Sequence, residues 1–387
     1  MRTVLKNATV FDERFCPQEH DLLLEGGRIA AVGARGAFTA ADAEQVDLSG
    51  LTVIPGMIDI HIHGYGGADT GDADPASIET MSARLAQHGV TAFCPTSMTL
   101  PADRLEAIFR CVAQSAGHTS GARPVGINME GPYISPGKVG GQNPAFVRKP
   151  DAAEFMRLQE ACGGMIRLVD IAPEEDTDGA FIRTVSGSGT VVSVAHTGAD
   201  YDAACAAFAA GCRHVTHLYN AMSGLNHRSP GVVGAVFDKA QEYGLHAELI
   251  CDGKHIHPAA LRIAFAQLGR DRSVIVSDAL SAAGTSDGRM VSGGLPVVVR
   301  DGVAYLDSGV IAGSTTDLEH ELQNVLHFGV PTEQALRSVT VNPARAIGMD
   351  GEIGRICAGY RADLTVMDDA WNVVSTYVGG KRVFHRA

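Results

Sequence analysis

The chain has 387 residues, of which 45% are apolar and 19% are charged, a composition typical of a folded globular protein and not of a disordered one. Its 31 basic and 44 acidic residues give a formal net charge of −13, which argues against nonspecific nucleic-acid binding because such binding needs a basic surface. A small anionic substrate is not excluded, because one arginine can hold a phosphate on an acidic protein.

The chain shows no sign of export or of membrane insertion. Its first residues contain no apolar stretch of the kind found in signal peptides, and no uncharged apolar run reaches the ~18 residues of a membrane span. The eight cysteines form no Cys-X-X-Cys pair and read as reduced thiols. We therefore predict a cytoplasmic protein with neither a membrane nor a nucleic-acid partner.

Both ends of the chain are predicted to be rich in β-strands. Strands are expected at residues 4–10, 21–25 and 28–33 near the start, and at 362–367 and 373–384 near the end. Because chain termini often lie close together, the two ends are expected to pair. They would form one discontinuous β-sandwich domain, residues 1–54 plus 345–387.

The middle of the chain alternates short apolar runs with alanine- and leucine-rich helical stretches such as 75–88, 200–210 and 258–268. Strands are expected at residues 57–60, 90–94, 125–129, 166–171, 191–195, 214–216, 246–250 and 274–276. This alternation predicts an α/β fold, a TIM-type (β/α)8 barrel over residues 55–344 that carries the chemistry. A doubly wound sheet is the alternative, but the glycines at 64–67 do not match its G-X-G-X-X-G fingerprint.

Residues able to bind a metal stand at the ends of five predicted strands. They are His61 and His63, Glu130, His196, His217 and Asp278. The carboxyl ends of barrel strands converge on one face, and residues two apart on a strand point the same way. A pocket of imidazole and carboxylate groups suits Zn²⁺ or Fe²⁺.

A simpler interpretation is that each of these residues only makes hydrogen bonds, as single histidines at strand ends usually do. Four histidines and two carboxylates at successive strand ends are hard to explain that way, because burying so many ionisable groups is costly without a metal. Six further histidines are interpreted as structural: His88, His118, His214, His246, His320 and His327.

Seven segments then resemble the amidohydrolase superfamily, and within it the deacetylases of amino sugar phosphates. They are Pro55-Gly-Met-Ile-Asp-Ile-His-Ile-His-Gly, Met129-Glu-Gly-Pro-Tyr, Ala195-His-Thr-Gly-Ala, Thr216-His-Leu-Tyr-Asn-Ala-Met, Cys251-Asp-Gly-Lys-His, Val276-Ser-Asp-Ala and Ala312-Gly-Ser. Glu-Gly-Pro and His-Leu-Tyr-Asn-Ala-Met are specific to this branch, whereas His-X-His and the final aspartate occur throughout the superfamily. The resemblance covers essentially the whole chain.

The resemblance implies a role for each metal-binding position. Glu130, His196 and His217 would bind the principal metal. His61 and His63, with Glu130 bridging and Asp278 nearby, would bind a second one. Some family members have lost the second histidine of the pair and use one metal; this chain keeps both, so one or two ions per subunit are expected.

The resemblance also implies a substrate and the residues that hold it. The expected reaction removes the acetyl group from N-acetylglucosamine 6-phosphate through a metal-activated water, with Asp278 acting first as general base and then as general acid. The expected substrate-binding residues are Gly141, Gln142, Asn220, Ala221, Arg228, His255 and Ile311. Arg228 would reach the phosphate across the interface of a homodimer.

One residue departs from the family pattern. Gln142 stands where the family commonly has a histidine that contacts the substrate near the acetamide. A glutamine amide can donate a hydrogen bond but cannot carry a proton. Another N-acyl amino sugar phosphate, such as the galacto epimer, is therefore the alternative substrate.

Two rival functions are disfavoured by the sequence. Cyclic amide hydrolases of the superfamily bridge their metals with a carboxylated lysine on the fourth strand, and residues 166–171 contain no lysine. A non-catalytic relative would have lost metal ligands, whereas every expected ligand position is filled here.

Overall fold

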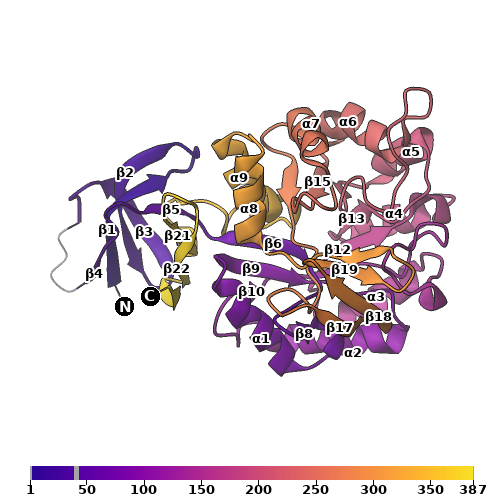
Figure 1. Cartoon of the computed structure of the whole chain (residues 1–387), viewed down its shortest axis with the longest axis horizontal. Coiled ribbons are helices and arrows are strands. Elements are labelled where there is room, and N and C mark those ends of the chain that lie inside the picture. Colours follow the sequence, from indigo (N-terminus) through magenta and orange to yellow (C-terminus); the bar gives the residue numbers. More distant parts are fainter. Residues whose placement is uncertain (1, 39–42, 387) are drawn as a thin grey trace.

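The computed structural model describes residues 2–38 and 43–386, which form a small sheet and a larger α/β part (Figure 1). The strands of the small sheet are β1 (Arg2–Phe11), β2 (Pro17–Glu25), β3 (Arg28–Ala34), β4 (Glu44–Asp47), β5 (Thr52–Pro55), β21 (Leu364–Met367), β22 (Val373–Val378) and β23 (Lys381–His385). Their order is β23-β22-β21-β5-β1-β2-β3, with β4 also paired to β1. The expected pairing of the two chain ends is confirmed, because β21 pairs antiparallel with β5.

The small sheet has a hydrophobic core of its own. Apolar side chains from both ends of the chain, among them Leu5, Leu22, Val53, Leu364 and Val366, are fully or almost fully buried in one cluster. Burying apolar surface of this kind contributes roughly 25 cal/mol per Å² to folding. The first and last segments of the chain therefore stabilise each other.

The larger part contains two parallel sheets. The first has the order β10-β9-β6 and the second the order β11-β12-β13-β14-β15-β16. Their strands are β6 (Met57–Ile62), β9 (Val90–Pro95), β10 (Arg123–Pro124), β11 (Ile127–Met129), β12 (Ile166–Ile171), β13 (Val191–Val194), β14 (His214–Val215), β15 (His246–Leu249) and β16 (Ser273–Ile275). All eight strands expected from the apolar runs are present, with ends shifted by no more than two residues.

Backbone hydrogen bonds connect the two parallel sheets at both edges. At one edge Thr96 bridges Asn128, and the Ser97 amide donates to the Asn128 carbonyl at 3.0 Å. At the other edge the Asp278 amide donates to the His61 carbonyl at 2.9 Å. The segments that carry the candidate site residues are thereby held next to one another.

The helices lie around these strands (Figure 1). They are α1 (Pro75–Ala86), α2 (Ala102–Ser115), α3 (Ala152–Ala161), α4 (Ala180–Gly187), α5 (Tyr201–Ala210), α6 (Gly231–Tyr243), α7 (Pro258–Leu268), α8 (Leu318–His327), α9 (Thr332–Val339) and α10 (Val341–Ala346). Several begin where the sequence supplies a cap: Asp74 accepts from the Ala76 amide at the start of α1, and Asp200 caps α5. None of the helices in the described ranges is long and apolar enough to cross a membrane.

A four-stranded antiparallel sheet follows β16 and was not anticipated from the sequence. Its strands are β17 (Gly288–Ser292), β18 (Leu295–Arg300), β19 (Val303–Leu306) and β20 (Ile311–Gly313). A shorter hairpin, β7 (Gly64–Tyr65) with β8 (Ala68–Asp69), follows β6. Both lie at the carboxyl ends of parallel strands, where they can help to enclose a site.

Candidate active site

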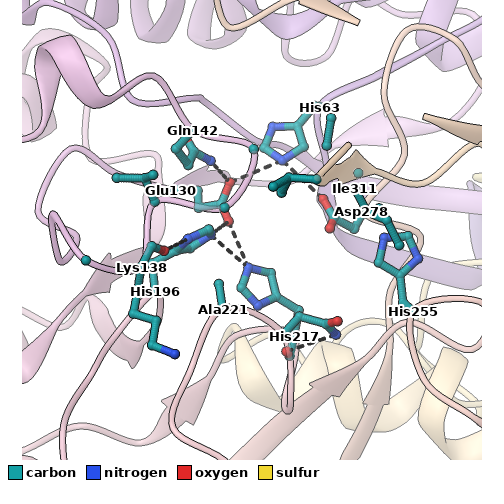
Figure 2. A pocket seen from close by; sticks show the side chains of 18 residues that line it. His63, Glu130, Lys138, Gln142, His196, His217, Ala221, His255, Asp278 and Ile311 are labelled. Atoms are coloured by element: carbon teal, nitrogen blue, oxygen red, sulfur yellow. Dashed lines mark hydrogen bonds and ion pairs between the residues drawn. The ribbon is translucent and has the colours of Figure 1, made fainter. Parts of the chain in front are cut away.

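The metal-capable residues come from the carboxyl ends of five parallel strands. His61 lies in β6 and His63 directly follows it, while Glu130, His196, His217 and Asp278 stand within three residues of the ends of β11, β13, β14 and β16. All six are buried. His63, Glu130, His196, His217 and Asp278 line one pocket of ≈480 Å³ (Figure 2), and His61 lies behind them, fully buried. The sequence-based prediction that these strand ends converge is confirmed.

Glu130 is the centre of the cluster. Its Oε1 lies 3.0 Å from His196 Nε2 and 3.0 Å from His217 Nε2, and these two nitrogens are 3.1 Å apart. His196 Nδ1 donates to the Lys138 carbonyl, so a neutral His196 faces the Glu130 carboxylate with the lone pair of Nε2, which is repulsive. A cation held by all three atoms would remove this repulsion.

The second half of the cluster brings His61 and His63 to the same carboxylate. His63 Nε2 is 3.2 Å from Glu130 Oε2 and 3.2 Å from Asp278 Oδ1. His61 Nε2 lies 3.7 Å from Glu130 Oε1 and 3.5 Å from Asp278 Oδ1. Two groups with the spacing of metal ligands therefore share Glu130: one with His61 and His63, the other with His196 and His217.

A buried nitrogen without a hydrogen-bond partner indicates that a metal fits this cluster. His61 Nε2 is buried and has no hydrogen-bond partner among the described residues. It points toward two carboxylates at distances too long for hydrogen bonds. A buried nitrogen left unpaired in this way is costly, whereas a divalent ion would use its lone pair. The donor set fits a metal that prefers nitrogen and carboxylate ligands.

The carboxylates and histidines of the cluster shift the pKa values of Glu130 and His63 toward the charged forms. Burial alone would raise the pKa of Glu130, but the facing histidines, His61, His196 and His217, outweigh burial and hold that pKa well below its usual range. Burial likewise opposes charge on His63, but Asp278 and Glu130 raise its pKa to about 9. The carboxylates thus favour positive charge at the histidines, and a divalent cation can replace the histidine protons as that charge.

The backbone at three of these positions is strained. His196, His217 and Asp278 have φ angles of 42°, 28° and 47°, in the left-handed region that residues with side chains rarely adopt. Such conformations cost about 1–3 kcal/mol each and cluster at functional sites. Each turns the chain sharply just after a parallel strand, and each residue ends up lining the pocket.

The candidate substrate residues divide into two groups. Gly141, Gln142, Asn220, Ala221, His255 and Ile311 all line the pocket, with Ile311 contributed by the antiparallel sheet (Figure 2). Arg228 does not: it is exposed in the loop before α6, and it is not among the residues that line the pocket of its own chain. Its role across a dimer interface stays a prediction.

Gln142 is held on both sides of its amide. Its Oε1 accepts from the Thr99 amide at 2.6 Å, and this fixes its Nε2 toward Glu130 Oε2, to which it donates. The side chain is only 3% exposed. Gln142 therefore orients the central carboxylate of the cluster in this structure.

Two polar residues of the site were missed in the sequence. Lys138 lines the pocket; its carbonyl accepts from His196 Nδ1 at 2.9 Å and its Nζ donates to the Met222 carbonyl at 3.3 Å. The only signal for Lys138 was its place in the glycine-rich loop after Glu-Gly-Pro. Glu248 lies behind the cluster and contacts His61, and its signal was the only carboxylate in the short strand β15.

A second cluster of His88, Asp317 and His320 also has the spacing of metal ligands. Its polar atoms are satisfied by one another: His88 Nδ1 lies 2.9 Å from Glu319 Oε2, and His320 Nδ1 lies 2.9 Å from Asp317. The Tyr65 hydroxyl donates to the Asp317 carboxylate at 3.1 Å. This cluster is explained as a hydrogen-bond network around the start of α8, and we assign no metal to it.

Known proteins are similar to this chain in sequence. Residues 52–383 match the amidohydrolase family. The chain is 36% identical over 337 residues to the N-acetylglucosamine-6-phosphate deacetylase of Bacillus subtilis (strain 168), which covers 86% of this chain and 84% of the relative. It is 32% identical over 384 residues to the N-acetylgalactosamine-6-phosphate deacetylase of Escherichia coli O157:H7, covering 98% and 99%.

Solved structures of N-acetylglucosamine-6-phosphate deacetylases are similar to this chain in fold. The N-acetylglucosamine-6-phosphate deacetylase of Pasteurella multocida superposes with a TM-score of 0.92 at 28% identity over 99% of each chain. A mutant of the Mycobacterium smegmatis N-acetyl-D-glucosamine-6-phosphate deacetylase, in complex with N-acetyl-D-glucosamine-6-phosphate, superposes with a TM-score of 0.89 at 33% identity over 99% of each chain.

Proposed function

The chain belongs to the amidohydrolase family, and from this premise we propose that it hydrolyses N-acetylglucosamine 6-phosphate to glucosamine 6-phosphate and acetate. The observation that carries the proposal is the meeting of His196, His217 and Asp278 around Glu130 in one pocket. This is an arrangement for hydrolysing an amide with metal assistance. The similarity to deacetylases over most of the chain selects the linear N-acetyl amide.

Glu130, His196 and His217 would hold the principal divalent metal, zinc or iron, and His61 and His63 would hold a second one. When bound there, the metal polarises the amide carbonyl and lowers the pKa of water. The Asp278 carboxylate takes a proton from the attacking water and delivers it to the departing amine nitrogen. Its Oδ1 lies 3.2 Å from His63 Nε2, so this carboxylate is held at the edge of the cluster that faces the pocket.

The rest of the pocket would bind the sugar and its phosphate. Asn220 and His255 offer polar groups, Ile311 an apolar wall, and Lys138 a cation. Arg228 of a second copy would complete the phosphate site in a homodimer, since its guanidinium matches phosphate oxygens. Binding energy from the phosphate orients the acetamide at the far end of the substrate.

N-acetylgalactosamine 6-phosphate is the second candidate substrate. The E. coli O157:H7 relative that is named for this epimer aligns over 98% of this chain. Gln142 also differs from the histidine common in the family, and both sides of its amide are already hydrogen-bonded. The residue that would read the acetamide end of the substrate is therefore not the usual one.

An acetate-release assay decides between these substrates. The purified protein is tested with N-acetylglucosamine 6-phosphate, its galacto and manno epimers, and unphosphorylated N-acetylglucosamine, with metal analysis of the same sample. We expect the highest kcat/KM for the gluco 6-phosphate and a much lower one for the unphosphorylated sugar. A higher kcat/KM for the galacto epimer would reassign the substrate, and no acetate release from any of them would reject the function.

The wider architecture follows from the same premise. We propose that the two parallel sheets form one closed (β/α)8 barrel, supported by the hydrogen bonds at both of their edges. The catalytic domain would span residues 55–344, and residues 1–54 with 345–387 would form the β-sandwich domain. Limited proteolysis tests these boundaries, because cleavage is expected first in segments that join domains.

A further inference from the structure

Glu248 is a fully buried carboxylate directly behind the metal cluster. It lies on β15, between β14 and β16, and it does not line the pocket. Its relative exposure is 0%. It therefore cannot touch a substrate in the pocket, and its role has to be sought in the residues that it contacts.

One oxygen of Glu248 contacts both halves of the cluster. Oε2 lies 2.8 Å from His61 Nδ1 and accepts from the His217 backbone amide at 3.1 Å. The Glu248 carbonyl also accepts from the Leu218 amide at 2.8 Å. Glu248 thus ties the histidine pair at the end of β6 to the segment that presents His217.

The contact with His61 determines which ring nitrogen is free. A neutral imidazole carries one proton, and a carboxylate at Nδ1 keeps the proton there. Nε2 is then left as a lone pair, which is the form that binds a metal. Nε2 is the atom without a hydrogen-bond partner, and it points toward Glu130 and Asp278.

Burial of Glu248 is costly for folding, and its hydrogen bonds satisfy only one of its two carboxylate oxygens. Its second oxygen, Oε1, has no hydrogen-bond partner among the described residues, and the His214 Nε2 that faces it is 3.8 Å away. An apolar side chain on this strand would avoid the cost of burying a charge. The contact with His61 is the feature that explains why a carboxylate stands here.

We propose that Glu248 is a positioning residue for the second metal position. This inference rests on the proposed metal-dependent function. It holds His61 through Nδ1, so that Nε2 is presented as a ligand beside His63, Glu130 and Asp278. Partners of this kind, placed behind a metal-binding histidine, change metal affinity by about 10–100-fold when they are removed.

The experiment titrates the metal-free protein with Co²⁺ and follows both the visible absorption and the number of ions bound. The wild type is expected to bind two equivalents. Glu248→Leu is expected to weaken the second equivalent at least about tenfold. It is expected to weaken the first equivalent much less, because Glu248 contacts His217 through the backbone amide and not through the imidazole. Glu248→Gln keeps a carbonyl acceptor for the imidazole proton but loses the charge. Its affinity for the second equivalent is expected to lie between those of the wild type and Glu248→Leu.

Glu321→Gln is the matched control. Glu321 is also a fully buried carboxylate, but it accepts from the Cys251 backbone amide and contacts none of the proposed ligands. This variant is expected to bind both equivalents like the wild type. The first equivalent serves as an internal control for folding, because general damage would weaken both.

The outcomes separate this inference from the function on which it rests. A wild type that binds no metal would overturn the proposed function. A wild type that binds one equivalent, or a Glu248→Leu protein that binds two with unchanged affinities, would overturn only the role of Glu248. If Glu248→Leu does not fold, Glu248→Gln decides, and unchanged binding of the second equivalent by that variant rejects the inference.

Discussion

Asp278 combines two roles that a single substitution can separate. It lies beside His63 and His61 at distances of 3.2 and 3.5 Å, and it also lines the pocket. In Asp278→Asn the amide oxygen can still face the metal but the side chain can no longer take up a proton. We expect the variant to keep its metal and to lose about 10³-fold in kcat.

Metal analysis and single-turnover acetate release check this prediction together. Asp369→Asn is the control, since Asp369 is exposed and does not line the pocket. Near-normal turnover of Asp278→Asn would remove the proton-transfer role. Loss of the metal in the same variant would instead show that Asp278 is needed as a ligand.

Many residues of the site could be predicted from the sequence, and there is a physical reason why the others were missed. His61, His63, Glu130, His196, His217 and Asp278 were found because ionisable residues at successive strand ends are unusual. Glu248 was missed because nothing in a sequence shows that a carboxylate in a strand faces a histidine about 190 residues away. The same limit hid the hydrogen bonds of Gln142, which depend on Thr99 and Glu130.

His246 is predicted to make folding sensitive to acid. Burial, followed by the nearby His214, Arg345 and Arg272, lowers its pKa to about 3. Its folded pKa is thus below the unfolded value of ~6.5, so its neutral form contributes stability above pH ~6.5 that is lost as the pH falls toward 3. We expect the free energy of unfolding to lose up to about 1.4 kcal/mol per pH unit in this window from this group.

Denaturant unfolding of the metal-free protein at several pH values between 4.5 and 7 measures the effect. His246→Gln should flatten the dependence on pH, because the glutamine does not titrate. His118→Gln, at an exposed position, should leave the slope unchanged. An identical slope in wild type and His246→Gln would show that His246 is not responsible.

At the scale of elements, the parallel strands were predictable and the antiparallel sheet was not. Strands such as β6 and β9 are buried along their whole length and appear in the sequence as short, mainly apolar runs. The strands β17 and β18 are partly exposed, and periodicity alone does not show where such a hairpin packs. The family resemblance predicted Ile311 as a pocket residue, but only the structure shows that it is carried there by β20 of an antiparallel sheet.

The close approach of β20 to the loop after Glu130 predicts the effect of a single methyl group. A Cβ at Gly141 would lie 2.5 Å from the Ala312 carbonyl oxygen, a backbone atom of β20, which pairs with β19 on both sides of Ala312. Gly141→Ala must therefore displace this strand and the Ile311 wall. Overpacking of this kind costs about 1–3 kcal/mol, so we expect KM to rise about tenfold.

Steady-state kinetics with the phosphorylated sugar tests this displacement. Gly137→Ala is the matched control from the same loop: Gly137 also lines the pocket, but a Cβ there has its nearest neighbour 4.0 Å away. The control should leave KM unchanged. An unchanged KM for Gly141→Ala would mean that β20 does not help to hold the substrate.

At the scale of the whole molecule, the charge of the pocket supports the proposed contribution of Arg228 from a second copy. The chain has a net charge of −13, and Lys138 is the only lysine or arginine lining the pocket within the described part of the chain. One cation that also donates to the Met222 carbonyl is a weak site for a phosphate dianion. Arg228 is exposed on a loop with the exposed Leu225, so it is available to a neighbouring subunit.

Mixing two impaired variants tests whether Arg228 acts across a dimer. Arg228→Ala alone is expected to raise KM for the phosphorylated sugar about 10–100-fold, with little effect on the unphosphorylated one. When it is refolded with an equal amount of Asp278→Asn, half of the dimers should be mixed, and each mixed dimer has one site with both residues intact. At substrate concentrations below KM, about one quarter of the wild-type activity should then return.

Asp278→Asn mixed with His196→Ala is the control and should recover nothing, because these residues line the pocket of one chain. Absence of recovery with Arg228→Ala would place the phosphate contact within a single subunit.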